Sequence, residues 1–228
     1  MIGIIELPKH PFISSKIHNY VKWIESSGAK ACIIPYNVSL SELTSILSTI
    51  SGIVFTGGSI NNKKKYTDKQ RITYVTTLHH AYSQIKQYNN QGRYFPIWGT
   101  CLGFEMLMLF QQNRPIEHIF DYLQPHKLKG VSTIKMKDSR IKSFFPTWII
   151  PEMETRLCAI HSHTFGFDIV PNKNITIVST ESNFINMIEF KQYPFYGLQF
   201  HPEKYNDPFS KQISILFSCF FYSECKKK

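Results

Sequence analysis

Short apolar runs alternate with amphipathic stretches through the first half of the chain, and this alternation constrains the fold more than any other feature. The apolar runs cover 2–7, 30–35 and 52–55, and helical spacing of apolar residues follows each of them at 17–24, 39–50 and 68–88. Strands that alternate with helices form parallel sheets whose crossover helices cover both faces. The sequence therefore predicts an α/β fold with a central, mostly parallel sheet and helices on both faces.

Apolar side chains at helical spacing indicate which faces of these helices are buried. In the first helix they are Ile17, Tyr20, Val21 and Ile24, and in the third they are Ile72, Val75, Leu78, Tyr82 and Ile85. Ser39 or Ser41 is expected to cap the second helix. The pair His79–His80 is interpreted as helix surface and not as a metal site, because no Cys or carboxylate lies nearby at ligand spacing. No metal and no cofactor is expected.

The second half of the chain is more irregular. We expect loop and short strands over 111–136, a brief helix over 139–145 and a strand over 157–160 that runs into residues 161–166. A hairpin of strands 175–180 and 186–190, a last strand over 194–200 and a packing helix over 211–224 are expected to follow. No linker, repeat or low-complexity segment divides the sequence. We therefore expect a single domain over residues 1–228.

Composition narrows the class of protein. A hydrophobic content of 43% with 14% aromatic residues is typical of a globular protein, and no apolar run reaches the roughly 20 residues of a membrane span. Five cysteines without regular spacing suggest reduced thiols. Residues 1–8 lack the features of a signal peptide, so we expect a cytoplasmic protein, or a secreted or lysosomal one if the sequence is a mature form.

The formal net charge of +10 raises the question of nucleic-acid binding. The two lysine runs, Lys63–Lys65 and Lys226–Lys228, lie in a polar loop and at the chain end, where they are expected to be solvated. Neither nucleic acid nor a membrane is therefore an expected partner. Attraction of an anionic substrate explains the charge better.

A cysteine between two glycines follows the strand that starts near Tyr94. The segment Gly99-Thr100-Cys101-Leu102-Gly103 reads as a tight turn into a helix that continues to Phe110. Such a turn exposes one side chain, and the helix N-terminus is expected to lower the pKa of its thiol below about 8.5. The alternative is a buried structural cysteine.

A second polar motif follows the last strand. His201-Pro202-Glu203 is expected to be extended, because the proline restricts the residue before it, so His201 and Glu203 share one face. A carboxylate beside an imidazole fixes its tautomer and leaves the other nitrogen for a nucleophile. Gly57 and Gly58 end the third strand, at the edge of the sheet where such folds place their ligands, and could present a backbone N–H to a reacting carbonyl.

Together these motifs resemble the γ-glutamyl hydrolase family within the class I glutamine amidotransferase superfamily. The resemblance rests on Phe-Pro-Ile-Trp-Gly-Thr-Cys-Leu-Gly-Phe-Glu at 95–105 and Gly-Leu-Gln-Phe-His-Pro-Glu at 197–203, with further likeness at 19–29, 57–59, 139–146 and 193–204. It implies a flavodoxin-like three-layer sandwich and a possible homodimer. It also implies cleavage of the γ-glutamyl bonds of folyl-poly-γ-glutamates, small-molecule substrates.

The resemblance also implies roles for individual residues. Cys101 would be the nucleophile, His201 the general base and acid, and Glu203 the residue that orients it. The oxyanion would be bound by the backbone N–H groups of Gly58 and Leu102, and the substrate by His161, Glu105 and Lys204. His163 could replace His161 in that role.

Three other functions remain open from the sequence. A glutaminase subunit would act on free glutamine and pass ammonia to a partner. A binding module without turnover would be expected to have lost Cys101, His201 or Glu203, and all three are present. Nucleic-acid binding is the third and the least favoured.

Overall fold

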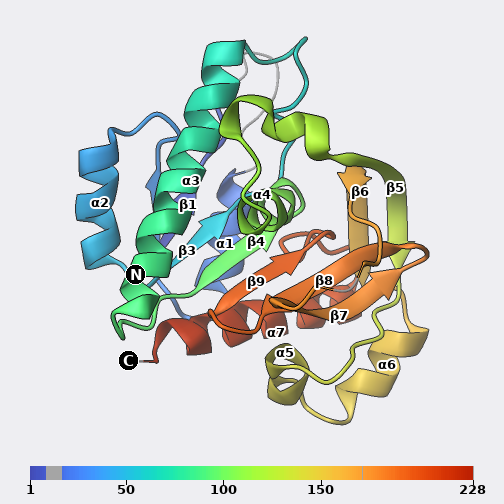
Figure 1. Ribbon diagram of the computed structural model, residues 1–228. Helices are drawn as coiled ribbons and strands as arrows, with labels where there is room; N and C mark the ends of the chain where they lie inside the picture. The colour runs from blue at the N-terminus through green and yellow to red at the C-terminus, as the bar shows by residue number, and fades with distance from the viewer. Residues whose placement is uncertain (9–16, 171, 228) are drawn as a thin grey trace.

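The computed structural model describes residues 1–8, 17–170 and 172–227. Among them, seven strands form a central sheet in the order β2-β1-β3-β4-β9-β8-β7 (Figure 1). The bounds are β1 Ile2–Ile5, β2 Ala31–Ile34, β3 Gly52–Phe55, β4 Ile97–Thr100, β7 Ile175–Glu181, β8 Phe184–Phe190 and β9 Phe195–Leu198. β2, β1, β3, β4 and β9 are parallel neighbours, whereas β8 and β7 continue the sheet in antiparallel pairing. The predicted mostly parallel sheet and its hairpin are confirmed.

Helices cover both faces of this sheet, as predicted. On one face α2 (Leu40–Thr49), α3 (Asp68–Asn90) and α4 (Leu102–Gln111) enclose a core that includes Phe55 and Ile97. On the other face α1 (Ile17–Glu25) and α7 (Pro208–Cys225) enclose a second core around Trp98. Figure 1 shows α7 across the sheet from α3. The three layers place the carboxyl ends of the parallel strands at one edge of the sheet.

The segment between α4 and β7 was predicted least well. It contains a 3-10 helix η1 (Ile116–Tyr122), a two-stranded antiparallel sheet of β5 (Gln124–Ser132) and β6 (Ala159–Gly166), and two short helices, α5 (Arg140–Phe144) and α6 (Ile149–Thr155). The sequence predicted α5 but neither η1 nor α6. The strand predicted over 157–160 corresponds to β6, which begins at Ala159 and continues through Gly166.

Local capping chemistry explains several boundaries. The Ser39 hydroxyl accepts a hydrogen bond from the Glu42 N–H at 3.2 Å, so Ser39 and not Ser41 caps α2.

In α3 the predicted inward position of Ile72 is wrong, because Ile72 is 47% exposed. Tyr74 and Ala81 complete the buried stripe instead. Lys63–Lys65 are exposed as expected, whereas Lys228, at the end of the second lysine run, lies outside the described residues.

Two glycines let α4 approach the sheet more closely than other residues would allow. A Cβ atom at Gly103 would lie 2.1 Å from the carbonyl oxygen of Phe55 in β3. A Cβ atom at Gly99 would lie 2.6 Å from the carbonyl oxygen of Gly103. The start of α4 therefore packs with its backbone directly against β3 and β4. This contact fixes where Cys101, the residue before α4, can lie.

A membrane span requires a helix that is both long and apolar. No helix within 1–8, 17–170 and 172–227 meets both conditions.

Replacement of Gly103 by alanine tests the packing of α4. The added methyl group would meet a backbone carbonyl that cannot rotate away, so we expect Gly103→Ala to lower the free energy of unfolding by about 1–3 kcal/mol. Urea denaturation followed by circular dichroism measures the change. An unfolding midpoint equal to that of the wild type would contradict this account of the α4 contact.

Candidate active site

Cys101 occupies the turn between β4 and α4. Its backbone has φ 50° and ψ −107°, a conformation that residues with a side chain rarely adopt. Its N–H donates to the Leu198 carbonyl of β9 at 2.7 Å, and its carbonyl accepts from the Glu105 N–H of α4 at 2.9 Å. The sheet and the helix together hold this strained turn. Strain of this kind in a packed turn is typical of a functional residue.

The electrostatic surroundings of the thiol differ from the prediction. Burial, with the Cys101 side chain only 3% exposed, raises the pKa of the thiol well above its usual range, and the charges of Glu105 and Glu203 raise it further. The Leu102 N–H and the Lys204 charge lower it by less. The predicted fall in the pKa of the Cys101 thiol is therefore wrong, because burial outweighs the effect of the α4 N-terminus. The thiol keeps its proton until a base removes it.

His201 and Glu203 form a hydrogen-bonded pair just after β9. His201 Nδ1 lies 2.7 Å from Glu203 Oε1, and both side chains are buried. Burial alone would raise the pKa of Glu203, but the adjacent His201 holds it below its usual value. A charged carboxylate requires the proton on Nδ1, which leaves Nε2 as the free acceptor. The His201 N–H also donates to the Ile160 carbonyl at 2.8 Å, which ties this segment to β6.

Cys101 and His201 meet at Gly57, although they are far apart in the sequence. The position that a Cβ atom would occupy on Gly57 lies 2.9 Å from His201 Cε1 and 3.1 Å from Cys101 Cβ. The His201 imidazole and the Cys101 side chain therefore border the same point at the end of β3. Any residue larger than glycine would have to push between them. The structure thus brings the predicted thiol, imidazole and carboxylate into one place.

The backbone groups at the ends of β3 and β4 differ in what they bind. The Leu102 N–H donates a hydrogen bond to the Cys101 sulfur. The Gly57 N–H is already used, because it donates to the Tyr20 hydroxyl at 2.8 Å. Gly58 is exposed, and a Cβ on it would lie 2.2 Å from Leu7 Cδ1. Leu102 thus lies directly after Cys101 at the start of α4, and Gly58 lies in the turn after β3.

Glu105, predicted to bind substrate, lies in the first turn of α4 and is 4% exposed. Gln199 Nε2 donates to its Oε1 at 3.1 Å, and burial raises the pKa of Glu105 to about 7. Gln199 immediately follows the buried strand β9, yet its role was missed in the sequence. Lys204, also predicted to bind substrate, is half-buried beside Glu203 at a pocket of about 440 Å³.

The two histidines of β6 are bonded to each other. His161 Nδ1 lies 3.3 Å from His163 Nε2, and His161 Nε2 lies 2.9 Å from the Ser132 hydroxyl. His163 Nδ1 in turn lies 3.0 Å from the Phe165 carbonyl, so it carries the proton. Burial and the neighbouring imidazoles, including His201, lower the pKa of His161 to about 3. Both histidines therefore stay neutral, and both ring nitrogens of His161 are engaged within the protein.

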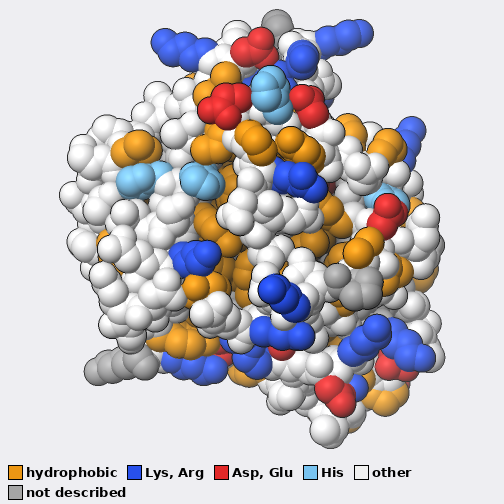
Figure 2. All heavy atoms as spheres, in the orientation of Figure 1, with side chains coloured by type: hydrophobic (Ala, Val, Ile, Leu, Met, Phe, Trp, Pro, Cys, Tyr) orange, Lys and Arg blue, Asp and Glu red, His pale blue; other side chains and the backbone are white. Residues whose placement is uncertain are grey.

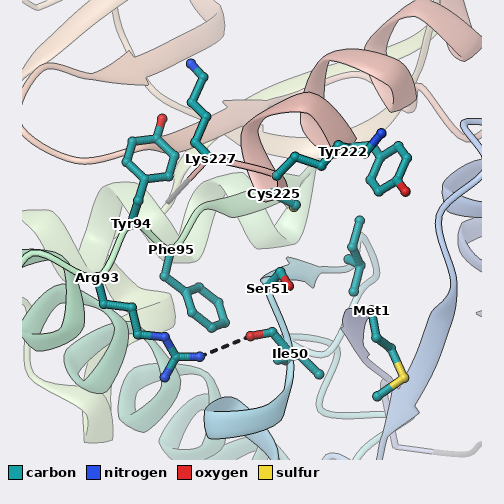
Figure 3. A pocket seen from close by; sticks show the side chains of 11 residues that line it. Met1, Ile50, Ser51, Arg93, Tyr94, Phe95, Tyr222, Cys225 and Lys227 are labelled. Atoms are coloured by element: carbon teal, nitrogen blue, oxygen red, sulfur yellow. Dashed lines mark hydrogen bonds between the residues drawn. The ribbon is translucent and has the colours of Figure 1, made fainter.

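Other features of the described part of the chain offer no competing site. It holds no cluster of three or more His, Cys, Asp or Glu residues suited to a metal ion, and its five cysteines are unbonded. A pocket of about 610 Å³ lies near the start of β1 and the end of α7 (Figure 3). Its Arg93 donates to the carbonyls of Leu47 and Ile50 at the end of α2, so that cation is already engaged. On the face shown in Figure 2, Lys and Arg side chains are scattered among neutral and acidic ones.

The raised pKa of Glu105 makes a prediction about stability. Between its ordinary value of 4.5 and about 7, the folded protein keeps a proton on Glu105 that the unfolded chain has lost. Stability from this group is therefore present at low pH and is lost as pH rises through about 7. We expect Glu105→Gln to match the wild type near pH 5 and to be more stable at pH 8, by up to roughly 3 kcal/mol.

Urea denaturation at both pH values measures this difference. Glu25→Gln, at an exposed position, is the matched control and should leave the pH dependence unchanged. Parallel stability curves for Glu105→Gln and the wild type would show that the Glu105 carboxyl titrates normally.

The chain is similar in sequence to one group of known enzymes. The sequence model of the peptidase C26 family matches residues 8–203. γ-Glutamyl hydrolase B of Dictyostelium discoideum is 32% identical over 228 residues, which cover 90% of this chain and 62% of that protein. The human γ-glutamyl hydrolase is 29% identical over 203 residues, which cover 82% of this chain and 59% of that one. The chain thus spans less than two thirds of the length of these two relatives.

A solved structure supports the fold. A crystal structure described as that of a GMP synthase subunit from Thermoplasma acidophilum matches with a TM-score of 0.62 and covers 100% of this chain and 98% of its own. At 18% identity this likeness concerns the fold alone. The predicted resemblance to γ-glutamyl hydrolases is confirmed by the family match and by the two relatives. The chain belongs to the peptidase C26 family.

Proposed function

We propose that this protein hydrolyses γ-glutamyl bonds, with folyl-poly-γ-glutamates as the substrate class, and that Cys101 is its nucleophile. The observation that carries the proposal is the meeting of Cys101 and His201 at Gly57, with Glu203 2.7 Å behind the imidazole. Membership of the peptidase C26 family and relatives named γ-glutamyl hydrolase favour the γ-glutamyl bond as the target.

The first half of the reaction forms a thioester. His201 Nε2 takes the proton from the Cys101 thiol, and the thiolate attacks the carbonyl carbon of the γ-amide. The oxyanion accepts hydrogen bonds from the N–H groups of Leu102 and Gly58, which are worth several kcal/mol in a site that excludes water. The carbon–nitrogen bond then breaks, and the leaving amine takes the proton from His201. The product is a γ-glutamyl thioester on Cys101 and a free amine.

The second half returns the enzyme to its starting state. Water gives a proton to His201 Nε2 and attacks the thioester carbonyl. The carbon–sulfur bond breaks, the released thiolate recovers its proton from His201, and the γ-glutamyl group leaves as a carboxylic acid. Glu203 stabilises the imidazolium in both halves without itself taking the proton.

Burial of the Cys101 thiol makes the mechanism depend on His201 as the general base. Because the pKa of the Cys101 thiol is raised, the thiolate forms in this mechanism only when His201 takes its proton. The neutral His161 and His163 add no competing cation beside Cys101 and His201. The charge of Lys204 favours the thiolate and is suited to a substrate carboxylate. A net charge of +10 would further attract an anionic γ-glutamyl chain.

Parallel assays of two substrates test the proposal. We expect the wild type to cleave a p-aminobenzoyl-poly-γ-glutamate and to leave free glutamine intact. Cys101→Ala should lower the rate more than about a thousandfold, because no other group replaces the sulfur. Glu203→Gln should lower it about a hundredfold or more, because an amide favours the wrong tautomer of His201. Liquid chromatography of the released amine measures both.

Cys219→Ala is the matched control, because Cys219 is a half-buried free cysteine of α7 with no proposed role; this variant should retain full activity. Turnover of glutamine alone would replace the proposal with that of a glutaminase. Equal rates for Cys101→Ala and the wild type would exclude Cys101 as the nucleophile.

A further inference from the structure

Tyr20 brings a buried hydroxyl to the centre of the candidate active site. It lies on the inner face of α1, where its ring packs in the same apolar core as Trp23, and the residue is 2% exposed. Its hydroxyl oxygen accepts the hydrogen bond from the Gly57 N–H at 2.8 Å. That oxygen is 3.0 Å from the Cβ position of Gly57, the same point that Cys101 and His201 border.

The Tyr20 hydroxyl also interacts with the Glu203 carboxylate. Oε1 of Glu203 is bonded to His201, whereas Oε2 is buried and has no partner at ordinary hydrogen-bond distance among the described residues. Burial raises the pKa of Tyr20 well above its usual value, and the charge of Glu203 raises it further. The phenol therefore keeps its hydrogen. Since the oxygen accepts from Gly57, that hydrogen is free to point towards the carboxylate.

The two contacts join the two halves of the site. Gly57 precedes Gly58, the proposed oxyanion donor, so the bonded Gly57 N–H anchors the peptide directly before the one that carries the Gly58 N–H. Glu203 orients His201. A single side chain from α1 thus lies between the turn after β3 and the segment after β9. Thr56 anchors the start of that turn, since its hydroxyl donates to the Ile5 carbonyl at 3.0 Å.

We infer that Tyr20 is a positioning residue, which holds the Gly57–Gly58 turn and the His201–Glu203 pair in register with the Cys101 thiol. The inference rests on the proposed hydrolase reaction for its effect on turnover. Its effect on the thiol itself does not require a substrate. The chemistry of the proposed reaction remains with Cys101 and His201, and Tyr20 acts through them.

The test uses Tyr20→Phe, which keeps the ring and removes the hydroxyl. Iodoacetamide alkylation of Cys101, followed by mass spectrometry of its peptide, reports how readily the thiol is ionised. We expect the alkylation rate near pH 7 to fall about tenfold, as loss of a buried hydrogen bond would cause. With a γ-glutamyl substrate, kcat should fall by a similar factor and KM should change less. The matched control is Tyr82→Phe, because Tyr82 is also buried but lies in α3. This variant should be alkylated at the wild-type rate.

A double-mutant cycle separates positioning from general packing. If Tyr20 acts through Glu203, then Tyr20→Phe should slow alkylation much less in a Glu203→Gln background than in the wild type. Additive effects, or a Tyr20→Phe rate within about twofold of the wild type, would overturn the inference. If Tyr20→Phe does not fold, Gly57→Ala tests the same junction, because its methyl group would separate the three side chains. An unchanged alkylation rate in Gly57→Ala would again overturn it.

Failure of the proposed function gives a different result. In that case the wild type would not cleave the γ-glutamyl substrate, yet alkylation of Cys101 would still depend jointly on Tyr20 and Glu203.

Discussion

The structure depends on the close contact between the first turn of α4 and the strands beneath it. Gly99 and Gly103 allow backbone to touch backbone, and the chain between them has to turn sharply. Cys101 takes up that turn with a positive φ angle, which a side chain tolerates only when its surroundings hold it there. Cys101 is 3% exposed at this turn. The close contact of α4 with the strands therefore determines where Cys101 lies.

Burial then determines which groups near the thiol carry charge. The pKa of Cys101 is raised, that of Glu105 is raised to about 7, and that of His161 is lowered to about 3. Each shift favours the neutral form of its group. Glu203 is the exception, because the hydrogen bond from His201 offsets its burial. Under the proposed mechanism, His201 and Glu203 control the ionisation of the Cys101 sulfur, and few other charges compete with them.

The sequence indicated the parts of this fold that follow simple periodic rules. Alternation of apolar and helical segments predicted the parallel sheet, and the positions of Cys101, His201 and Glu203 relative to strand ends predicted where they meet. The histidines of β6 were harder, because inward-facing polar residues hide a strand's alternation. Tyr20 occupies a regular core position on α1, so nothing in the sequence distinguishes its hydroxyl. The prediction for the pKa of Cys101 was wrong because depth of burial cannot be derived from a local motif.

The central claim is that the sulfur of Cys101 carries the γ-glutamyl group between the two halves of the reaction. A single-turnover experiment with enzyme in excess over a γ-glutamyl substrate, quenched with acid at early times, tests it most directly. Mass spectrometry of the digested protein should find the γ-glutamyl group on the peptide that contains Cys101, forming as the amine is released and then decaying. Release of the amine with no adduct on that peptide at any time, or with the adduct on another residue, would contradict the account.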